Sequence, residues 1–400
     1  MKKYEGMFKK YFILNSNQNA ASEEAQKLLN SVSTIDLGFS IGEHPAFIVY
    51  CDELIQELTA IRQINTDINQ VSRNLPVMAM QQFIKQALIE EIHQTNQIEN
   101  VNSTRKEIKD ALLVIENGKK GSRFDSMIRK YQMLLSLQQI PLSSCQDVRD
   151  LYDSFIADEV LKEDPNDAPD GLYFRKGSVS VVKNGQEIHQ GVNPESKLNC
   201  AMEQALLFLN NDDYDPLIRI AGFHYLFGYI HPFYNGNGRM TRFISSYELC
   251  HAGIHLLAAL RLSYIIKNSR TQYYKLFKTT NDRRNFGDVT LFVTGFLKFI
   301  EDACSEVAEF LNEKNALLTH YFDIIEQYTD DPDIRELLRL LVQVSVCEGD
   351  SLSISELMQA CGKSKYIIVK QLDSIANLCK VQSGRPKLYR ADLEKLDEMQ

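Results

Sequence analysis

Residues 231–242 read His-Pro-Phe-Tyr-Asn-Gly-Asn-Gly-Arg-Met-Thr-Arg, and the rest of the chain is best interpreted outward from this stretch. Upstream, Asp215-Pro216 predicts a helix start, because Asp is a good N-cap and proline suits the first helical position. Proline at 232 ends that helix near His231, since proline removes a backbone donor and disfavours helix in the preceding residue. A second helix is predicted after Gly238. The stretch is therefore a helix, a glycine loop and a new helix N-terminus.

This arrangement is typical of an anion site. Glycines let backbone N–H groups turn inward, and a helix N-terminus adds partial positive charge. Arg239 and Arg242 lie on one face of the first turn, where cations oppose the helix dipole and therefore favour a bound anion. Two arginines and free amides suit a polyphosphate, and His231 lies where a base could meet a hydroxyl. The alternative is a glycine turn between core helices with solvated arginines.

The stretch resembles the signature of the Fic family, His-x-Phe-x-(Asp/Glu)-Gly-Asn-Gly-Arg-x-x-Arg. The resemblance implies a mainly α fold, with a Fic (Fido) helical core and a β-hairpin flap. It also implies transfer of AMP from ATP to a Ser, Thr or Tyr hydroxyl of a protein. His231 would be the general base, and Arg242 would hold the γ-phosphate. The residues that would cradle the phosphates are Gly236, Asn237, Gly238 and Arg239.

One position departs from the signature, because Asn235 stands where the family has a carboxylate that helps to bind Mg²⁺. An amide oxygen can ligate magnesium but brings no charge. The resemblance thus implies ATP and Mg²⁺ as cofactors, with Asn235 as the weakest part of the metal assignment.

Residues 95–100 resemble the inhibitory motif of Fic proteins, (Ser/Thr)-x-x-x-Glu-(Gly/Asn), matched by Thr95, Glu99 and Asn100. An apolar stripe from residue 78 to residue 92 predicts a helix leading into this motif. The resemblance implies that Glu99 competes with the γ-phosphate for the guanidinium of Arg242. The alternative is a solvated glutamate on a helix face.

Two further segments resemble parts of the family. Tyr274 and Asn281 keep the spacing of its nucleoside-binding residues, although a tyrosine pair in a helix is more often part of a core. Residues 173–182 are β-rich, and Asn184-Gly185 predicts a two-residue hairpin turn, with a return strand at 186–190. This hairpin resembles the flap that pins the target protein's backbone as an added strand. The alternative is a surface hairpin, and no catalytic role is expected for His189.

The coarse pattern predicts three regions. Residues 1–110 form a mostly helical region with the inhibitory helix, and within it residues 38–50 hold a short strand. Residues 111–328 form the catalytic core, with an acidic loop at 158–171. Residues 334–400 follow a linker and resemble a winged helix-turn-helix. Between residues 362 and 392 there are seven Lys or Arg and two Asp, so DNA or protein contact through this region is left open.

Composition limits the class of protein. The net charge of −9 and a pI near 5.5 argue against a protein that coats nucleic acid over its whole surface. The eight cysteines include no Cys-x-x-Cys pair, which indicates free thiols in a reducing compartment. No apolar run approaches a signal peptide or a membrane span, so a cytoplasmic protein with no membrane contact is expected. A homo-oligomer stays open.

Three functions compete. The first is a protein adenylyltransferase that Glu99 inhibits. The second is removal of AMP by the same site, with Glu99 positioning a water. The third belongs to another class, a winged-helix DNA-binding regulator in which a nucleotide-bound core only senses.

Overall fold

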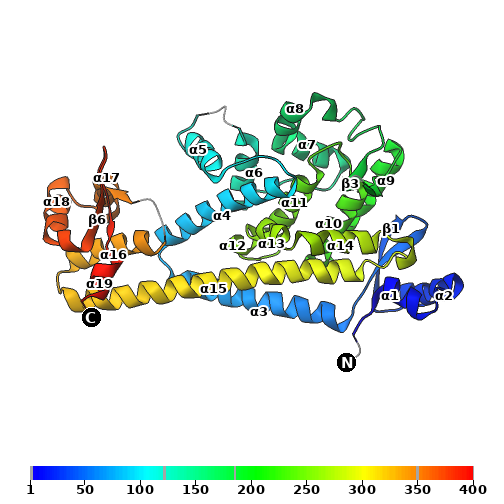
Figure 1. Cartoon of the computed structure of the whole chain (residues 1–400), viewed down its shortest axis with the longest axis horizontal. Coiled ribbons are helices and arrows are strands. Elements are labelled where there is room, and N and C mark those ends of the chain that lie inside the picture. The colour runs from blue at the N-terminus through cyan, green and yellow to red at the C-terminus, as the bar shows by residue number, and fades with distance from the viewer. Residues whose placement is uncertain (1–2, 120–122, 184–185, 348–350, 400) are drawn as a thin grey trace. The chain divides into compact units, whose positions relative to one another are not determined.

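The structure is a computed structural model that describes residues 3–119, 123–183, 186–347 and 351–399. Within these residues the chain is mainly helical, with small antiparallel sheets, as Figure 1 shows, and the predicted mainly α fold is confirmed. Contacts divide the chain into two compact units, residues 1–65 with 87–305 and residues 66–86 with 306–400. These boundaries fall within the three long helices: α3 (Asp52–Asn74), α4 (Val77–Ile98) and α15 (Thr290–Tyr328).

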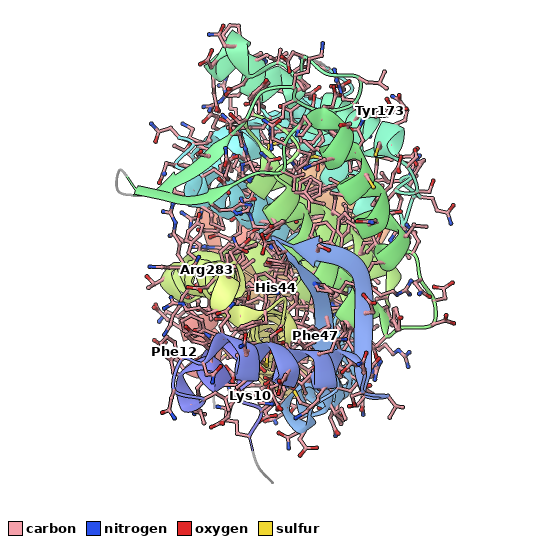
Figure 2. The ribbon with its side chains drawn as sticks, turned by 90° about the vertical axis from the view of Figure 1, so that its right-hand side faces the viewer. Lys10, Phe12, His44, Phe47, Tyr173 and Arg283 are labelled. Atoms are coloured by element: carbon pink, nitrogen blue, oxygen red, sulfur yellow. The ribbon has the colours of Figure 1, made fainter. Side chains whose placement is uncertain are left out.

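The first unit begins with two helices and a hairpin. They are α1 (Gly6–Ile13), α2 (Gln18–Leu29), β1 (Thr34–Ile41) and β2 (His44–Val49). Met7, Ala21 and Phe47 are buried in a small core that these elements form. Figure 2 looks onto these elements, with Phe47 of β2 labelled. The sequence predicts only one short strand in this region. It misses the hairpin because the turn at 42–43, Gly-Glu, is not a strong hairpin signal.

The middle of the unit is a bundle of helices around the glycine loop. The helices before the loop are α5 (Arg105–Glu116), α6 (Asp125–Leu135), α7 (Cys145–Phe155), α8 (Ala157–Glu163) and α9 (Glu195–Leu209). The predicted loop at 158–171 is therefore partly wrong, because its first residues continue as α8. Asp158 and Glu159 favour a helix there, since acidic side chains stabilise a first turn.

The two central helices are α10 (Pro216–Ile230) and α11 (Asn237–His251). Asp215 caps α10 through a hydrogen bond from the Leu217 amide, as the sequence predicts. The walls around them come from α12 (Leu256–Ala259), α13 (Leu262–Asn268), α14 (Arg270–Thr280) and the start of α15. The side chains of α10 are almost all buried, so this helix is the centre of the core.

The predicted flap is a shorter hairpin than the sequence indicates. Its strands are β3 (Ser180–Lys183) and β4 (Gln186–Gln190), which pair antiparallel. The predicted turn, Asn184-Gly185, lies outside the described residues. Residues 173–179 form no strand, although they are rich in residues that favour one. In Figure 2 the hairpin projects from the body of the unit, with Tyr173 in the segment that leads to it.

The second unit has a small helical region and a sheet at its C-terminal end. Its elements are α16 (Pro332–Val346), β5 (Leu352–Ser353), α17 (Ile354–Cys361), α18 (Lys365–Ser374), β6 (Cys379–Gln382), β7 (Leu388–Ala391) and α19 (Leu393–Asp397). The strand order is β5-β7-β6. Ser353 and Glu356 form a capping box at the start of α17, and Gly362 ends that helix with φ of 64°.

Among the described residues, no helix is both long enough and apolar enough to cross a membrane.

Candidate functional site

The conformation of the loop between α10 and α11 is held by hydrogen bonds of the side chain at the start of α11. His231 ends α10 in a left-handed conformation, with φ of 53°, because Pro232 cannot continue the helix. Gly236 precedes α11 with φ of 84°, a conformation that suits glycine. Asn237 ties the loop together, since its side chain accepts from the Phe233 amide at 2.9 Å and donates to the Phe233 carbonyl at 2.7 Å. The loop therefore presents a fixed helix N-terminus.

The two arginines of the first turn of α11 are both buried. Arg239 is 0 % exposed, and within the described part of the chain none of its three side-chain nitrogens has a hydrogen-bond partner. The carboxylate of Glu163 lies 3.8 Å from it, which is an ion pair without a hydrogen bond. A buried guanidinium with no hydrogen bonds is costly, so a further acceptor is expected beside it.

The guanidinium of Arg242 donates hydrogen bonds to the last turn of α4 and to the residue that follows this helix. Its Nε donates to the Thr95 hydroxyl at 2.8 Å, and one terminal nitrogen donates to the Thr95 carbonyl at 3.1 Å. The same nitrogen donates to Glu99 Oε1 at 2.7 Å. Burial alone raises the pKa of Glu99, but the neighbouring Arg242 outweighs it, and the net pKa is lowered. Glu99 is therefore a carboxylate paired with a buried cation.

Glu99 also lies directly over the N-terminus of α11. A Cβ added to Gly238 would lie 2.0 Å from Glu99 Oε1, so only glycine leaves room for this approach. The carboxylate thus occupies the place where the dipole and the amides of α11 attract an anion. Asn100 follows with φ of 60°, which turns the chain away after the last residue of α4.

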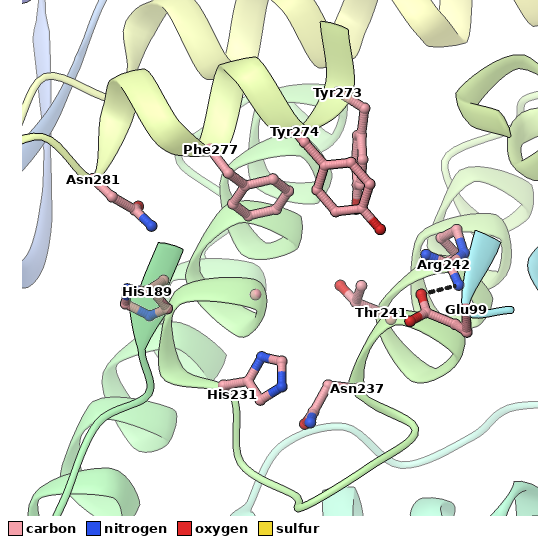
Figure 3. Close-up of a pocket in the computed structure, with 12 residues that line it drawn as sticks. Glu99, His189, His231, Asn237, Thr241, Arg242, Tyr273, Tyr274, Phe277 and Asn281 are labelled. Carbon is pink, nitrogen blue, oxygen red and sulfur yellow. Dashed lines mark hydrogen bonds and ion pairs between the residues drawn. The ribbon is translucent and has the colours of Figure 1, made fainter. Parts of the chain in front are cut away.

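One pocket joins these groups (Figure 3). Glu99 and Arg242 lie at one end of it, and His231 and Asn237 lie at its base. The opposite wall comes from α14 and the residue that ends it: Tyr273, Tyr274, Phe277 and Asn281. The remaining lining residues are His189, Gly228, Gly238 and Thr241. The pocket therefore combines aromatic rings on one side with an anion site on the other.

The α14 wall carries the two residues expected to meet a nucleoside. Tyr274 presents its ring to the pocket, and Asn281 lies at the other end of the same helix. The Asn281 side-chain oxygen accepts from the Tyr225 hydroxyl at 2.8 Å, which holds the amide in place. The structure thus brings both residues into the same pocket as the glycine loop.

His231 is placed to act as a base. Burial, followed by the charges of His189 and Arg175, lowers its pKa to about 4, so the imidazole is neutral at pH 7. A neutral imidazole can accept a proton from a hydroxyl. His224 is a core residue instead, since its ring nitrogens bond to Ser245 and Tyr273.

Asn235 is not among the residues that line the pocket, and its side chain is held by hydrogen bonds within the loop and to Asp167. Its side-chain oxygen accepts from the Gly236 amide at 2.7 Å, and its nitrogen donates to Asp167 Oδ2 at 3.0 Å. The described residues contain no group of three or more His, Cys, Asp or Glu side chains that could hold a metal ion. Asn235 in this arrangement does not fit the role of a magnesium ligand.

Sequence reasoning missed two buried charged residues near the site. Glu91 is 0 % exposed and accepts from Tyr131 and from the amide and hydroxyl of Ser263. Burial raises its pKa to about 7, although these hydrogen bonds oppose the shift. Arg175 is 1 % exposed and bonds to the carbonyl of His231. The spacing of Glu91, Thr95 and Glu99, one turn apart, is the signal that could have placed Glu91 on the buried face of α4.

Comparison with known proteins finds similarity over the part of the chain that contains the loop between α10 and α11. A family model described as Fic/DOC family matches residues 141–249. The protein named Protein adenylyltransferase Fic from Drosophila mojavensis is 32% identical over 140 residues, which cover 35% of this chain and 24% of that protein. The chain thus matches about a quarter of that relative's length.

The solved structures to which the chain is similar include two Fic proteins. A Fic family protein from Desulfovibrio desulfuricans G20 is 20% identical with a TM-score of 0.49, covering 83% of this chain and 96% of the other. A Fic domain containing signaling protein from Bacteroides thetaiotaomicron is 14% identical with a TM-score of 0.45, covering 63% and 95%. Residues 141–249 of the chain therefore resemble the Fic/DOC family domain.

Proposed function

We propose that this protein transfers AMP from ATP to a Ser, Thr or Tyr hydroxyl of a target protein, and that Glu99 holds the site inactive. The observation that carries the proposal is the pair of buried arginines on α11. Arg239 has no hydrogen bond from the described residues, and Arg242 is paired with a carboxylate that lies over the helix N-terminus. A triphosphate would supply acceptors to the first arginine and displace Glu99 from the second.

The chemistry follows from the groups that line the pocket. His231 takes the proton of the target hydroxyl, and the oxygen attacks the α-phosphorus of ATP. The new O–P bond forms as the bond between the α-phosphorus and the bridging oxygen breaks, and pyrophosphate leaves. The protein mainly positions the reactants and stabilises charge, which is typical of phosphoryl and nucleotidyl transfer. The adenine would lie against Tyr274, with Asn281 beside it.

The hairpin of β3 and β4 is the proposed place of the target. Residue His189 of β4 lines the pocket, so the hairpin borders the site at which the hydroxyl must arrive. A target segment that adds to this hairpin as a strand would be held by main-chain hydrogen bonds. Specificity would then come from side chains around the hairpin rather than from the pocket.

Magnesium is proposed to arrive with ATP, because triphosphates carry it through their own oxygens. Residue 235, where the family signature has a carboxylate, is hydrogen-bonded to the carboxylate of Asp167, which accepts from the Asn235 side-chain amide. No step above depends on a metal ligand from the protein.

Asn235→Asp tests this part of the loop. The new carboxylate would face Asp167 where an amide now donates, and a repulsion of about 1 kcal/mol lowers the melting temperature by about 2–4 °C in a domain of this size. We expect Mg²⁺ with ATP to restore the melting temperature, whereas ATP with a chelator should not. Asn166→Asp is the matched control, because Asn166 also donates to a carboxylate, that of Asp164, but outside the loop. An equal response of both variants to Mg²⁺ would show that even a carboxylate at residue 235 does not contact the metal.

Labelled ATP tests the proposed activity. The purified wild-type protein and Glu99→Gly are incubated with ATP labelled at the α- or at the γ-phosphate, in the presence of cell extract. Label that proteins retain only from the α-phosphate supports AMP transfer, and label only from the γ-phosphate indicates a kinase. Retention of neither label by any protein contradicts the proposal and favours a sensor or an enzyme that removes AMP.

A second function, DNA binding, is favoured by the surface of the C-terminal region. Its elements follow the order expected for a winged helix-turn-helix, and α18 exposes Lys365 and Lys370. Not all of the predicted basic patch is free, since Lys363 is paired with Asp333 at 2.7 Å and Lys380 with Asp392 at 3.0 Å. Binding to duplex DNA would therefore be weak.

Gel-shift titration of the full chain tests this second function. We expect binding at low salt with a slope of log K against log salt of about −4 to −5, if the five remaining Lys and Arg each meet a phosphate. Lys365→Glu with Lys370→Glu should abolish it, whereas Lys363→Gln should change it little because that lysine is already paired. An absence of binding at low salt would exclude DNA and leave a protein-docking role.

A further inference from the structure

Arg175 lies in the irregular segment before β3, and among the described residues its guanidinium bonds only to backbone carbonyls. Nε donates to the His231 carbonyl at 2.9 Å, and NH1 donates to that of Gly177 at 2.6 Å. NH2 donates to the carbonyls of Val192 at 3.0 Å and Ile230 at 3.4 Å. One planar group therefore holds four carbonyl oxygens.

These four carbonyls belong to three separate segments of the chain. One lies just before β3, one lies just after β4, and two lie at the end of α10, where the candidate base follows the helix. Both ends of the hairpin and the peptide of His231 are therefore fixed to the same guanidinium. Because the guanidinium is rigid and planar, it fixes the spacing of these segments as a flexible ammonium would not.

The surroundings of Arg175 are adapted to this contact. A Cβ on Gly191 would lie 2.4 Å from the guanidinium and 3.0 Å from the Cβ of His231, so glycine is needed there. Arg175 is 1 % exposed, and no carboxylate is paired with it among the described residues. Burial lowers its pKa. Burying a cation without an ionic partner opposes folding, and the four hydrogen bonds to carbonyls offset part of that cost.

We propose that Arg175 is a positioning residue, which sets the distance between a target hydroxyl held along the β3–β4 hairpin and the imidazole of His231. This inference rests on the proposed AMP transfer and adds a determinant of its rate. Arg175 makes none of its hydrogen bonds with the anion site on α11, so ATP binding does not depend on it. A displacement of about 1 Å between hydroxyl and base lowers the rate on the order of 10²-fold.

The first test is Arg175→Lys in the Glu99→Gly background, which keeps the charge and loses the planar fork. We expect transfer of AMP to the target to fall on the order of 10²-fold, while the Kd for ATP changes less than about twofold. Arg149→Lys is the matched control, because Arg149 donates to the Tyr173 carbonyl in the same segment but not to His231. Transfer by Arg175→Lys at the rate of the control would overturn the proposal.

The second test separates positioning from stability. Arg175→Ala is measured with and without added guanidinium at low millimolar concentration, and with ethylammonium as the control cation. We expect guanidinium alone to restore both the melting temperature and transfer, because only it matches the four carbonyls. If guanidinium restores the melting temperature but not transfer, Arg175 is a structural residue and the proposal is wrong.

A third measurement does not depend on AMP transfer at all. The charge of Arg175 is one of the causes that lower the pKa of His231. The NMR titration of His231 should therefore move to higher pH in Arg175→Gln and stay unmoved in Arg149→Gln. An unmoved titration in both would contradict the contact. Failure of Glu99→Gly to transfer AMP, with this shift present, would instead contradict the proposed function and leave the contact between Arg175 and His231 standing.

Discussion

Replacing Glu99 by glycine is expected to raise AMP transfer on the order of 10²-fold, because ATP phosphates displaced by about 1 Å react that much more slowly. In the structure the Glu99 carboxylate pairs with Arg242 and lies over Gly238 at the helix N-terminus. A γ-phosphate needs the same guanidinium and the same amides. On the proposed function, ATP that binds while Glu99 is there would have its phosphates displaced. The rate should therefore rise more than the affinity for ATP.

Matched variants separate this explanation from a general effect of charge. Glu99→Gln removes the charge at nearly constant shape and should also activate. Glu90→Gln removes a carboxylate from the same helix, but one that pairs with Arg105 at the surface, so it should leave transfer unchanged. Arg242→Ala added to Glu99→Gly should cancel the gain. Equal transfer by the wild type and Glu99→Gly, on a known target, would mean that Glu99 is an ordinary helix-face charge.

The loss of His231 is the second large effect. His231→Ala in the Glu99→Gly background should reduce transfer by about 10²- to 10⁴-fold, which is the usual contribution of a general base. The Kd for ATP should stay nearly the same, since the anion site is formed by α11 and its arginines. Because burial lowers the pKa of His231 to about 4, the imidazole stays neutral near pH 7 and becomes protonated as the pH falls toward 4. Transfer should therefore be lost only in acid.

His251→Ala provides the control for this experiment. His251 ends α11 and bonds to the Tyr247 carbonyl of its own helix, away from the pocket lining. It should transfer AMP at the rate of its Glu99→Gly parent. If His231→Ala keeps that rate as well, the base is another group or is not needed.

Local sequence patterns predicted the two central helices and the loop between them. Asp215 and Pro216 begin α10, and Pro232 ends it, because each acts on the backbone of its immediate neighbours. Gly236 and Gly238 indicate the loop and the close approach for the same reason. The return strand of the hairpin was predicted at its observed residues, 186–190. The first strand was predicted too long, because the segment before β3 is held by tertiary hydrogen bonds rather than by a partner strand.

Contacts between distant segments could not be predicted from local patterns. Glu99 and Arg242 are 143 residues apart, and only the resemblance of residues 95–100 to a family motif pointed to their pairing. Arg175 bonds to carbonyls up to 56 residues away. Because every residue has a backbone carbonyl, the sequence does not indicate which of them will accept such a bond. Glu91 is a carboxylate inside a core, whereas charge in a helix normally predicts an exposed face.

The most direct test is the chemical identity of the group that Glu99→Gly leaves on protein. After incubation with ATP and cell extract, peptide mass spectrometry identifies the adduct and the residue that carries it. The account predicts AMP on the hydroxyl of a Ser, Thr or Tyr, at a level far above wild type, and its absence when Arg242→Ala is added. Phosphate in place of AMP, or no adduct above the wild-type level, would contradict it.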